Sequence, residues 1–299
     1  MDLIATWDAK GLQYSVADNG VAWLRLNRPE KRNAIDRPLR TSIIEAVKEA
    51  TEDPAVKCAV ITGNGVAFSS GADLTQEGGA IEIPPERRAG NLGRTDGMLY
   101  GWYRMFEGIW RSGTPFIAGV NGIAAGGGCQ LALGCDMIIA SEAASFWEIF
   151  VRRGLPLEGG GAWLLTRSLS LPRAKEMALY GEPLPAKKAE EWGLVNRCVP
   201  AEEFEATLAD WADRLANLQP VMSGPPMGFP TTPGAERPKP DLSARVSHIK
   251  GQLNAAWEET MQQTFLDEVT LMGLSVWGPP PVMPGAPGAP ATGGPAAAH

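Results

Sequence analysis

The chain has 299 residues, of which 44% are hydrophobic, and it carries 27 Lys and Arg against 34 Asp and Glu, a formal net charge of −7. This length accommodates one large α/β domain or two smaller ones, with enough apolar residues for a sizeable core. The acidic balance gives no electrostatic support to a role in binding nucleic acid or an anionic membrane surface. An anionic small ligand is still compatible with it where basic residues cluster locally.

The cysteines and histidines do not have the spacing of metal ligands, so we expect no metal site. The four cysteines are expected to be reduced core residues: Cys58, Cys129, Cys135 and Cys198. We expect no signal peptide, because the first residues have neither a basic segment nor a long apolar run. Residues 112–135 carry no formal charge, but Pro115, Asn121, Gln130 and seven glycines interrupt them. We therefore expect a buried strand, loop and helix there rather than a membrane span, and a cytoplasmic protein.

The first half of the chain alternates predicted strands and helices. Residues 12–17 and 21–26 flank Asp18-Asn19-Gly20, which is typical of a β-hairpin. Asp36 is a candidate cap for a helix with a buried stripe of Leu39, Ile43, Ile44 and Val47. A strand at 58–61, a polar loop at 75–97, a helix at 98–111 and a strand at 116–120 are expected next. This order indicates an α/β fold, and its β-β-α start argues against a doubly wound nucleotide-binding fold.

The second half continues with shorter elements. We expect a strand at 137–140, helices at 172–180 and 186–192, a strand at 194–199, and helices at 201–217 and about 243–273. Residues 218–242 are rich in Pro and Gly and are expected to be irregular. The tail 278–299 consists largely of Pro, Gly and Ala and has almost nothing to bury, so we expect it to be disordered.

A glycine triplet, Gly126-Gly127-Gly128, lies between an apolar strand and a helix. Glycine lets backbone N–H groups approach a bound atom closely, and a helix N-terminus adds favourable polarity for a negative charge. Such a site can hold a developing oxyanion without any side chain. The alternative is a tight turn between two buried elements, and the triplet alone does not decide between them.

Several further motifs occur in a fixed order along the chain. They are Leu26-Asn27-Arg28-Pro29-Glu30-Lys31-Arg32-Asn33-Ala34, Ser70-Gly71-Ala72-Asp73-Leu74, Asn121-Gly122 with the first glycine triplet and Cys129, Gly159-Gly160-Gly161, and Ala189-x-x-Trp192-Gly193-Leu194-Val195. Together they resemble the crotonase superfamily, the enoyl-CoA hydratases and isomerases, over about residues 10–275. The resemblance implies a spiral of ββα repeats over 1–199, a helical trimerisation region over 200–277, and a homotrimer or dimer of trimers.

The resemblance also implies site residues. The substrate is an acyl-CoA, so coenzyme A arrives with the substrate and no separate cofactor is expected. The backbone N–H groups of Ala72 and Gly127 would hold the thioester oxygen and stabilise an enolate. Residues that would contact substrate are Arg28, Lys31, Arg32, Ala34, Ser70, Asp73, Leu74, Gln130 and Phe150. The alternative for the basic segment is a solvated turn.

The chain departs from a typical hydratase at both catalytic glutamates. Where the family has its first glutamate this chain has Gln130, which can orient a water but cannot act as an acid or base near neutral pH. When the chain is matched to the family motif without a gap, the position of the second catalytic glutamate falls on Phe150. Glu148 could take over this role only after a local shift of the chain. Glu158, before the second glycine triplet, is then the candidate catalytic carboxylate. The resemblance implies that an acid here moves a proton between the α- and γ-carbons, as in the isomerases.

A single carboxylate suffices for that reaction, since the proton it takes is the proton it returns. Leu157, Phe150 and Trp163 would give Glu158 an apolar setting and raise its pKa. The alternative is that Glu158 caps a helix N-terminus. Tyr100, Trp102 and Tyr103 suggest a bulky or ring-bearing acyl group.

We therefore predict an acyl-CoA enzyme that shifts a double bond. The alternatives are an enoyl-CoA hydratase using Glu158 or Glu148 with an oriented water, a hydrolase or C–C lyase of a β-keto acyl-CoA, and an acyl-CoA-binding protein without activity.

Overall fold

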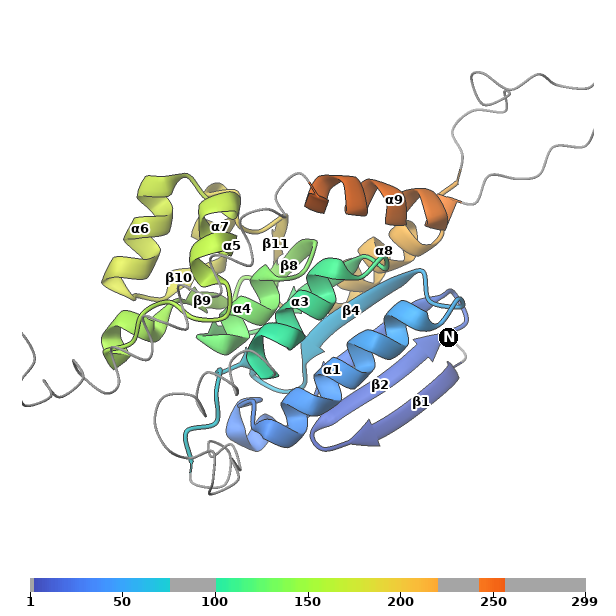
Figure 1. Ribbon diagram of the computed structural model, residues 1–299, viewed down its shortest axis with the longest axis horizontal. Helices are drawn as coiled ribbons and strands as arrows, with labels where there is room; N and C mark the ends of the chain where they lie inside the picture. The colour runs from blue at the N-terminus through green and yellow to red at the C-terminus, as the bar shows by residue number, and fades with distance from the viewer. Residues whose placement is uncertain (1–2, 76–100, 220–241, 256–299) are drawn as a thin grey trace, which may run out of the picture.

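The computed structural model describes residues 3–75, 101–219 and 242–255 (Figure 1). The predicted loop at 75–97, Tyr100, most of 218–242, the predicted helix beyond residue 255 and the tail at 278–299 lie outside these residues. Their predictions therefore stay predictions.

The larger of two sheets has seven strands in the order β1-β2-β3-β4-β6-β8-β11. Strands β1 to β3 are antiparallel, and the pairs from β3 to β11 are parallel. The strands are β1 (Leu3–Ala9), β2 (Leu12–Ala17), β3 (Val21–Leu26), β4 (Cys58–Gly63), β6 (Phe116–Val120), β8 (Met137–Ser141) and β11 (Arg197–Val199). The predicted hairpin is confirmed, since β2 pairs with β3 across the turn at Asp18-Asn19-Gly20.

The smaller sheet has the order β10-β9-β7-β5 and carries the short strands that lead into the site. Its members are β5 (Ala67–Ser69), β7 (Ile123–Ala125), β9 (Ser145–Trp147) and β10 (Leu184–Pro185). The first three pair in parallel, so β5 and β7 end at the same edge of this sheet. Ser70–Leu74 directly follows β5 and the first glycine triplet directly follows β7, which brings these two motifs together.

The helices follow the strand pairs. They are α1 (Arg37–Glu52), α3 (Tyr103–Arg111), α4 (Gly127–Leu133), α5 (Gly161–Ser168), α6 (Leu171–Tyr180), α7 (Ala186–Glu191), α8 (Phe204–Ala216) and α9 (Leu242–Ala255), with 3-10 turns η1 (Pro29–Lys31) and η4 (Ile149–Arg153). Strand, strand, helix recurs as β4-β5-α3 and β6-β7-α4, and β8-β9 leads through η4 to α5. The predicted ββα organisation is confirmed in this order.

Helix α1 shows how the sequence fixes an element. The Asp36 side chain accepts a hydrogen bond from Leu39 N at 2.8 Å, as predicted for its cap. Leu39, Ile43 and Val47 are buried, and Ile44 is half-buried beside them. In Figure 1 α1 runs alongside β2, and its contacts with β2 and β3 cover part of one face of the larger sheet.

Alternation along β3 separates two hydrophobic cores. Ala22, Leu24 and Leu26 belong to the core that contains α1, α3 and α4. Val21 and Trp23 point to the other face, where they pack with α8 through Phe204 and Leu208. Strand β3 contributes to both cores because successive side chains of a strand alternate between its faces.

Some predicted boundaries are wrong. The strand expected from Leu194 begins at Arg197, because the N–H groups of Leu194 and Val195 donate to Ala189 O and still close the end of α7. Helix α8 begins at Phe204 rather than at residue 201, whereas the predicted start of the helix at 98–111 lies outside the described residues, which contain α3 at Tyr103–Arg111. Strands β1, β5, β9 and β10 were not predicted; β5, β9 and β10 are too short for a periodic pattern.

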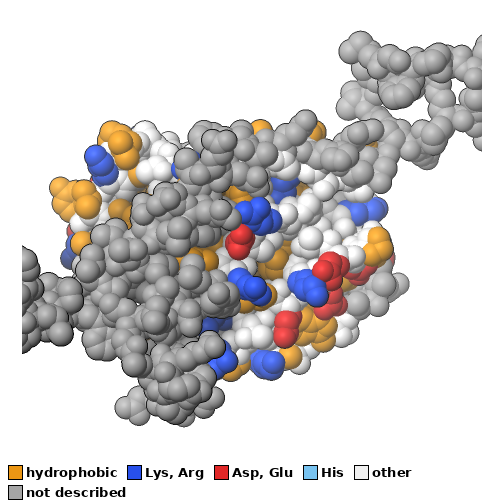
Figure 2. Space-filling model, viewed as in Figure 1, with side chains coloured by type: hydrophobic (Ala, Val, Ile, Leu, Met, Phe, Trp, Pro, Cys, Tyr) orange, Lys and Arg blue, Asp and Glu red, His pale blue; other side chains and the backbone are white. Residues whose placement is uncertain are grey.

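The surface and the cysteines agree with the composition. Cys58, Cys129 and Cys135 are buried, Cys198 is half-buried, and all four are free thiols. Figure 2 shows acidic and basic side chains interspersed over the part of the surface that α1 forms, where Lys48 and Glu52 pair at 3.7 Å. Among the described residues no helix is long and apolar enough to cross a membrane.

Candidate active site

Two loops meet at the edge of the smaller sheet and present backbone N–H groups to one cavity. Gly71 has φ +87°, and a Cβ added to it would lie 2.5 Å from Ala125 O and 3.3 Å from Gly127 N. Only a glycine at this position lets the loops after β5 and β7 pack so closely. The two predicted oxyanion donors, Ala72 and Gly127, both line the cavity.

Both N–H groups are left available by the local backbone. Ile35 N donates to Gly71 O, and Asp73 N donates to Ile35 O. These two hydrogen bonds form on either side of Ala72, and its N–H takes no part in them. Gly127 is the first residue of α4, where an N–H has no intrahelical acceptor. Within the described residues neither N–H donates to a backbone carbonyl. The arrangement can therefore bind a negatively charged oxygen.

The rest of the cavity wall is mostly aromatic and contains one carboxylate among the described residues. The lining residues are Ala72, Trp102, Phe106, Gly127, Gln130, Phe150, Glu158 and Gly159. Phe106 was not singled out from the sequence, although it lies four residues after Trp102, a spacing that places both on one helix face. Their rings stack with centroids 6.3 Å apart.

Glu158 lies at the cavity wall, half-exposed, just before α5. Gly160, rather than Glu158, occupies the N-cap position of that helix. The backbone carbonyl of Glu158 accepts a hydrogen bond from Gly161 N at 3.0 Å. Its carboxylate thus shares one cavity with the candidate oxyanion donors.

Glu148, the second candidate carboxylate, is in a different environment. Its side chain is fully buried, and Gln130 Nε2 donates to Oε1 and Oε2 at 2.9 and 2.8 Å. Glu148 is not among the residues that line the cavity, whereas Gln130 and Phe150 are. Burial, followed by the charge of Glu148, raises the pKa of the neighbouring Cys129 thiol. Among the described residues, Glu158 is therefore the carboxylate that a ligand in this cavity meets.

The predicted basic segment contacts the turn after β5. The Arg28 guanidinium donates to Ala34 O at 2.6 Å and to Asp73 Oδ2 at 3.1 Å, and it pairs with Asp36 at 3.0 Å. Lys31 Nζ lies 3.6 Å from the same Asp73 carboxylate. Arg28 and Asp73 thus hold the two predicted CoA-binding motifs together, and only 14% and 3% of their side chains are exposed.

The remaining predicted contact residues surround this ion-pair cluster. Ser70 Oγ donates to Lys31 O at 3.4 Å, Ala34 is buried, and Arg32 and Leu74 are exposed. Burial raises the pKa of Asp73, but hydrogen bonds from Thr75 and Arg28 more than offset it and hold that pKa at about 2. The motifs are therefore close in space, with Arg32 and Leu74 facing solvent.

Of the aromatic residues proposed to shape the acyl site, Trp102 lies in the cavity wall and Tyr103 lies in the core. A Cβ on Gly127 would lie 2.5 Å from Trp102 Cζ3, so the indole ring sits directly against the first turn of α4. Trp163, proposed as part of the apolar setting of Glu158, is buried and packs edge-on against Trp110.

Comparison with known proteins identifies the family. The model of the enoyl-CoA hydratase/isomerase family matches residues 16–223. The chain belongs to this family. It is thus an enzyme that acts on acyl-CoA, and its fold is the crotonase fold of α/β repeats predicted from the motifs.

The chain is similar both to proteins named isomerases and to proteins named hydratases. A 1,2-epoxyphenylacetyl-CoA isomerase of Escherichia coli is 36% identical over 68% of this chain and 73% of its own length. A probable enoyl-CoA hydratase of Rhodobacter capsulatus is 32% identical over 86% and 95%. The solved structure of an enoyl-CoA hydratase/isomerase from Xanthobacter autotrophicus has a TM-score of 0.73 and 28% identity, covering 90% of this chain and 89% of that one.

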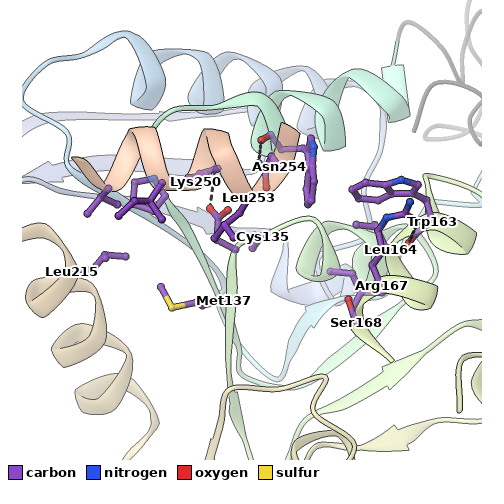
Figure 3. A pocket seen from close by; sticks show the side chains of 16 residues that line it. Cys135, Met137, Trp163, Leu164, Arg167, Ser168, Leu215, Lys250, Leu253 and Asn254 are labelled. Atoms are coloured by element: carbon purple, nitrogen blue, oxygen red, sulfur yellow. Dashed lines mark hydrogen bonds and ion pairs between the residues drawn. The ribbon is translucent and has the colours of Figure 1, made fainter. Parts of the chain in front are cut away.

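A wider groove of about 470 Å³ lies away from this cavity, between α9, α5 and α8 (Figure 3). Its carboxylate, Asp136, is bound by Lys250 Nζ at 2.8 Å, and Lys250 also donates to Ile109 O and Thr114 O at 3.0 Å. These contacts fasten α9 to the body of the protein. Asp136 therefore has a structural role in this groove, whereas the candidate catalytic groups line the smaller cavity.

Proposed function

We propose that the protein isomerises an enoyl-CoA by moving a double bond, with Glu158 as the proton carrier. In this reaction the Glu158 carboxylate takes a proton from the α-carbon of a 3-enoyl thioester. The electron pair left on the α-carbon delocalises onto the thioester oxygen, which the N–H groups of Ala72 and Gly127 stabilise, and through the double bond onto the γ-carbon. The same acid then returns the proton to the γ-carbon, giving the conjugated 2-enoyl thioester.

The observation that carries this proposal is the different placement of the two carboxylates. Glu158 lines the cavity with both candidate oxyanion donors, whereas Glu148 lies behind Gln130 and is fully buried. Hydration at the β-carbon needs one group to activate water and another to protonate the α-carbon. One accessible carboxylate fits a reaction in which a single group does both proton transfers.

Hydration is the second candidate, and one observation favours it. Gln130 Oε1 is buried and has no hydrogen-bond partner among the described residues. An amide oxygen beside the cavity can orient a water that Glu158 activates. A hydratase would then use Glu158 with Gln130, rather than Glu148.

The aromatic wall supports a bulky or ring-bearing acyl group as substrate. Trp102, Phe106 and Phe150 line the cavity beside Glu158. Flat apolar rings bury large area and stack against another ring at favourable offsets. A cytoplasmic homotrimer or dimer of trimers, implied by the resemblance, is part of the proposal, and light scattering of the purified chain tests the assembly.

The test is the mass and label pattern of the product. A 3-enoyl-CoA is incubated with the enzyme in heavy water and the product is analysed by mass spectrometry. Isomerisation is expected to give 2-enoyl-CoA with no added water, and deuterium enters the α- and γ-carbons when the half-exposed Glu158 exchanges the proton it carries with solvent before returning it. A product that gains the mass of water contradicts isomerisation and supports hydration. Measurable CoA-ester binding without any label or product contradicts both.

A further inference from the structure

The Gln130 side chain is held in one orientation by groups on three sides. Its Nε2 donates to both oxygens of Glu148, at 2.9 and 2.8 Å. A Cβ on Gly161 would lie 2.6 Å from Nε2 and 3.3 Å from Oε1, and a Cβ on Gly159 would lie 3.2 Å from Cγ. The second glycine triplet, which the sequence offered as a family motif, therefore makes the space that the amide occupies.

Reversing the amide would be unfavourable. A half-turn about the last side-chain bond exchanges Nε2 and Oε1, which would place an amide oxygen against both oxygens of a buried carboxylate. Two acceptors without a proton between them repel each other strongly where water is excluded. Glu148 therefore selects the orientation in which Gln130 donates to it and keeps Oε1 for another partner.

That second partner is missing among the described residues. Gln130 is fully buried, it lines the cavity with Gly127 and Glu158, and its Oε1 has no hydrogen bond. Buried acceptors in folded proteins are paired with few exceptions, and the exceptions gather at functional sites. The free acceptor is thus part of the cavity wall, prepared for a donor that arrives with the ligand.

The position of Gln130 indicates which part of an acyl group would meet it. Gln130 lies three residues after Gly127 in α4, so both residues are on the same face, one turn apart. A thioester oxygen held at Gly127 N would place the next acyl carbons along this face. The chain atom one turn away from the oxygen site is the β-carbon or a neighbour of it.

We propose that Glu148 is a positioning residue that fixes Gln130 as a hydrogen-bond acceptor, so that the cavity selects acyl-CoA ligands with a donor at the β-carbon over ligands with an acceptor there. This inference rests on the proposed function, since it places an acyl-CoA in the same cavity. It assigns no proton transfer to Glu148. In a bound complex, Gln130 Oε1 would accept from a hydroxyl or a water at the β-carbon and would reject a carbonyl there.

Three ligands of similar size test this selection. They are 3-hydroxybutyryl-CoA, which carries a donor, 3-oxobutyryl-CoA, which carries only an acceptor, and butyryl-CoA, which carries neither. Dissociation constants are measured by calorimetry in a Glu158→Gln background, so that the proposed base does not convert or ionise the ligands. The hydroxy ligand is expected to bind at least about tenfold more tightly than the oxo ligand, since a buried acceptor facing another acceptor is left unpaired.

Adding Glu148→Gln should remove the preference, because a neutral amide at residue 148 pairs with either orientation of Gln130. The hydroxy-to-oxo ratio is expected to fall to near one, while butyryl-CoA binds as before. Gln130→Leu should also bring the ratio near one. Glu142→Gln is the matched control: Glu142 lies nearby in sequence but pairs at the surface with Lys187 at 2.9 Å, so the ratio should not change.

Two results would overturn the inference. One is an equal or stronger affinity for the oxo ligand in the parent protein. The other is a ratio that stays the same in both the Glu148→Gln and Gln130→Leu proteins, including an equal loss of affinity for all three ligands, which would mark Glu148 as structural only. If Glu148→Gln fails to fold, Gln130→Leu alone decides. If the Glu158→Gln protein still converts a ligand, the proposed function is contradicted. The selectivity of the cavity is then determined from the ligands that are not converted.

Discussion

Glu148 and Glu158 are ten residues apart, and the structure places them in opposite environments. Glu148 is fully buried and bound by the Gln130 amide, whereas Glu158 is half-exposed at the wall of the cavity. The difference follows from the local backbone: Glu148 lies between β9 and η4 and is buried, while Glu158 precedes a run of glycines that opens α5. Access to the ligand, rather than position along the chain, decides which carboxylate can transfer protons.

The largest effect is expected from Glu158→Gln. This change keeps the size of the side chain and removes its capacity to carry a proton, so kcat should fall by about 10²–10⁴-fold. The dissociation constant for the acyl-CoA should stay within about twofold, since the thioester contacts come from the backbone. Steady-state kinetics and calorimetry check the two quantities. A loss of affinity that matches the loss of kcat would mean that Glu158 binds rather than reacts.

A second prediction concerns the oxyanion side of the cavity. In Gly127→Ala the new methyl group would collide with Trp102, whose ring atoms lie 2.5 and 2.8 Å from its position. Shifting the ring or the first turn of α4 misplaces the Gly127 N–H, and turnover should fall about 100-fold. Trp102→Ala in the same chain should recover part of it.

Gly108→Ala in α3 is the control for this prediction. A Cβ there meets only Val47, at 3.4 Å, so activity should be unchanged. If Gly127→Ala is as active as Gly108→Ala, the first turn of α4 does not hold the thioester oxygen.

A third prediction tests the region far from the cavity. Lys250→Met removes the cation that pairs with Asp136 and caps two backbone carbonyls. The Asp136 carboxylate is partly exposed and still accepts from Phe116 N at 2.7 Å, so losing the charged hydrogen bond should cost about 1–3 kcal/mol of unfolding free energy, measured by urea denaturation. Asp136→Asn in the same chain should restore part of it. An unchanged free energy would show that α9 is not held by this pair.

The smallest effect is expected from Asp73→Asn, as a change in pH dependence. The pKa of Asp73 is lowered from 3.8 to about 2 in the folded protein. Its stabilisation is therefore present above pH 4 and is lost as the pH falls towards 2, when the carboxylate takes up a proton. The variant should be less stable at pH 6 and should lose less stability between pH 4 and 2. Asp210→Asn, at an exposed pair with Arg214, should behave as wild type.

The sequence predicted much of this molecule because local signals were strong. The hairpin at Asp18-Asn19-Gly20 and the cap at Asp36 follow from residues whose backbone preferences are narrow, whereas the meeting of Ala72 with Gly127 was implied by the family resemblance. The short strands β5 and β9 were missed, because three residues cannot show a period. Their pairing is fixed by neighbours distant in sequence.

The arrangement of the carboxylates could be predicted only in part. Counting along the chain left Glu148 as a possible substitute for a hydratase glutamate, and it could not show that Gln130 binds it. That contact joins α4 to the end of β9 and depends on tertiary packing. Phe106 was missed for a similar reason, since a core residue and a cavity residue on one helix face have the same sequence pattern.

The most direct test is the rate at which the α-hydrogens of a 3-enoyl-CoA exchange with heavy water in two matched variants, Glu158→Gln and Glu148→Gln. This measurement follows the proton transfer itself and does not depend on product release. The account predicts that exchange is lost in Glu158→Gln and stays within about tenfold of wild type in Glu148→Gln. Exchange that survives in Glu158→Gln and disappears in Glu148→Gln would contradict it.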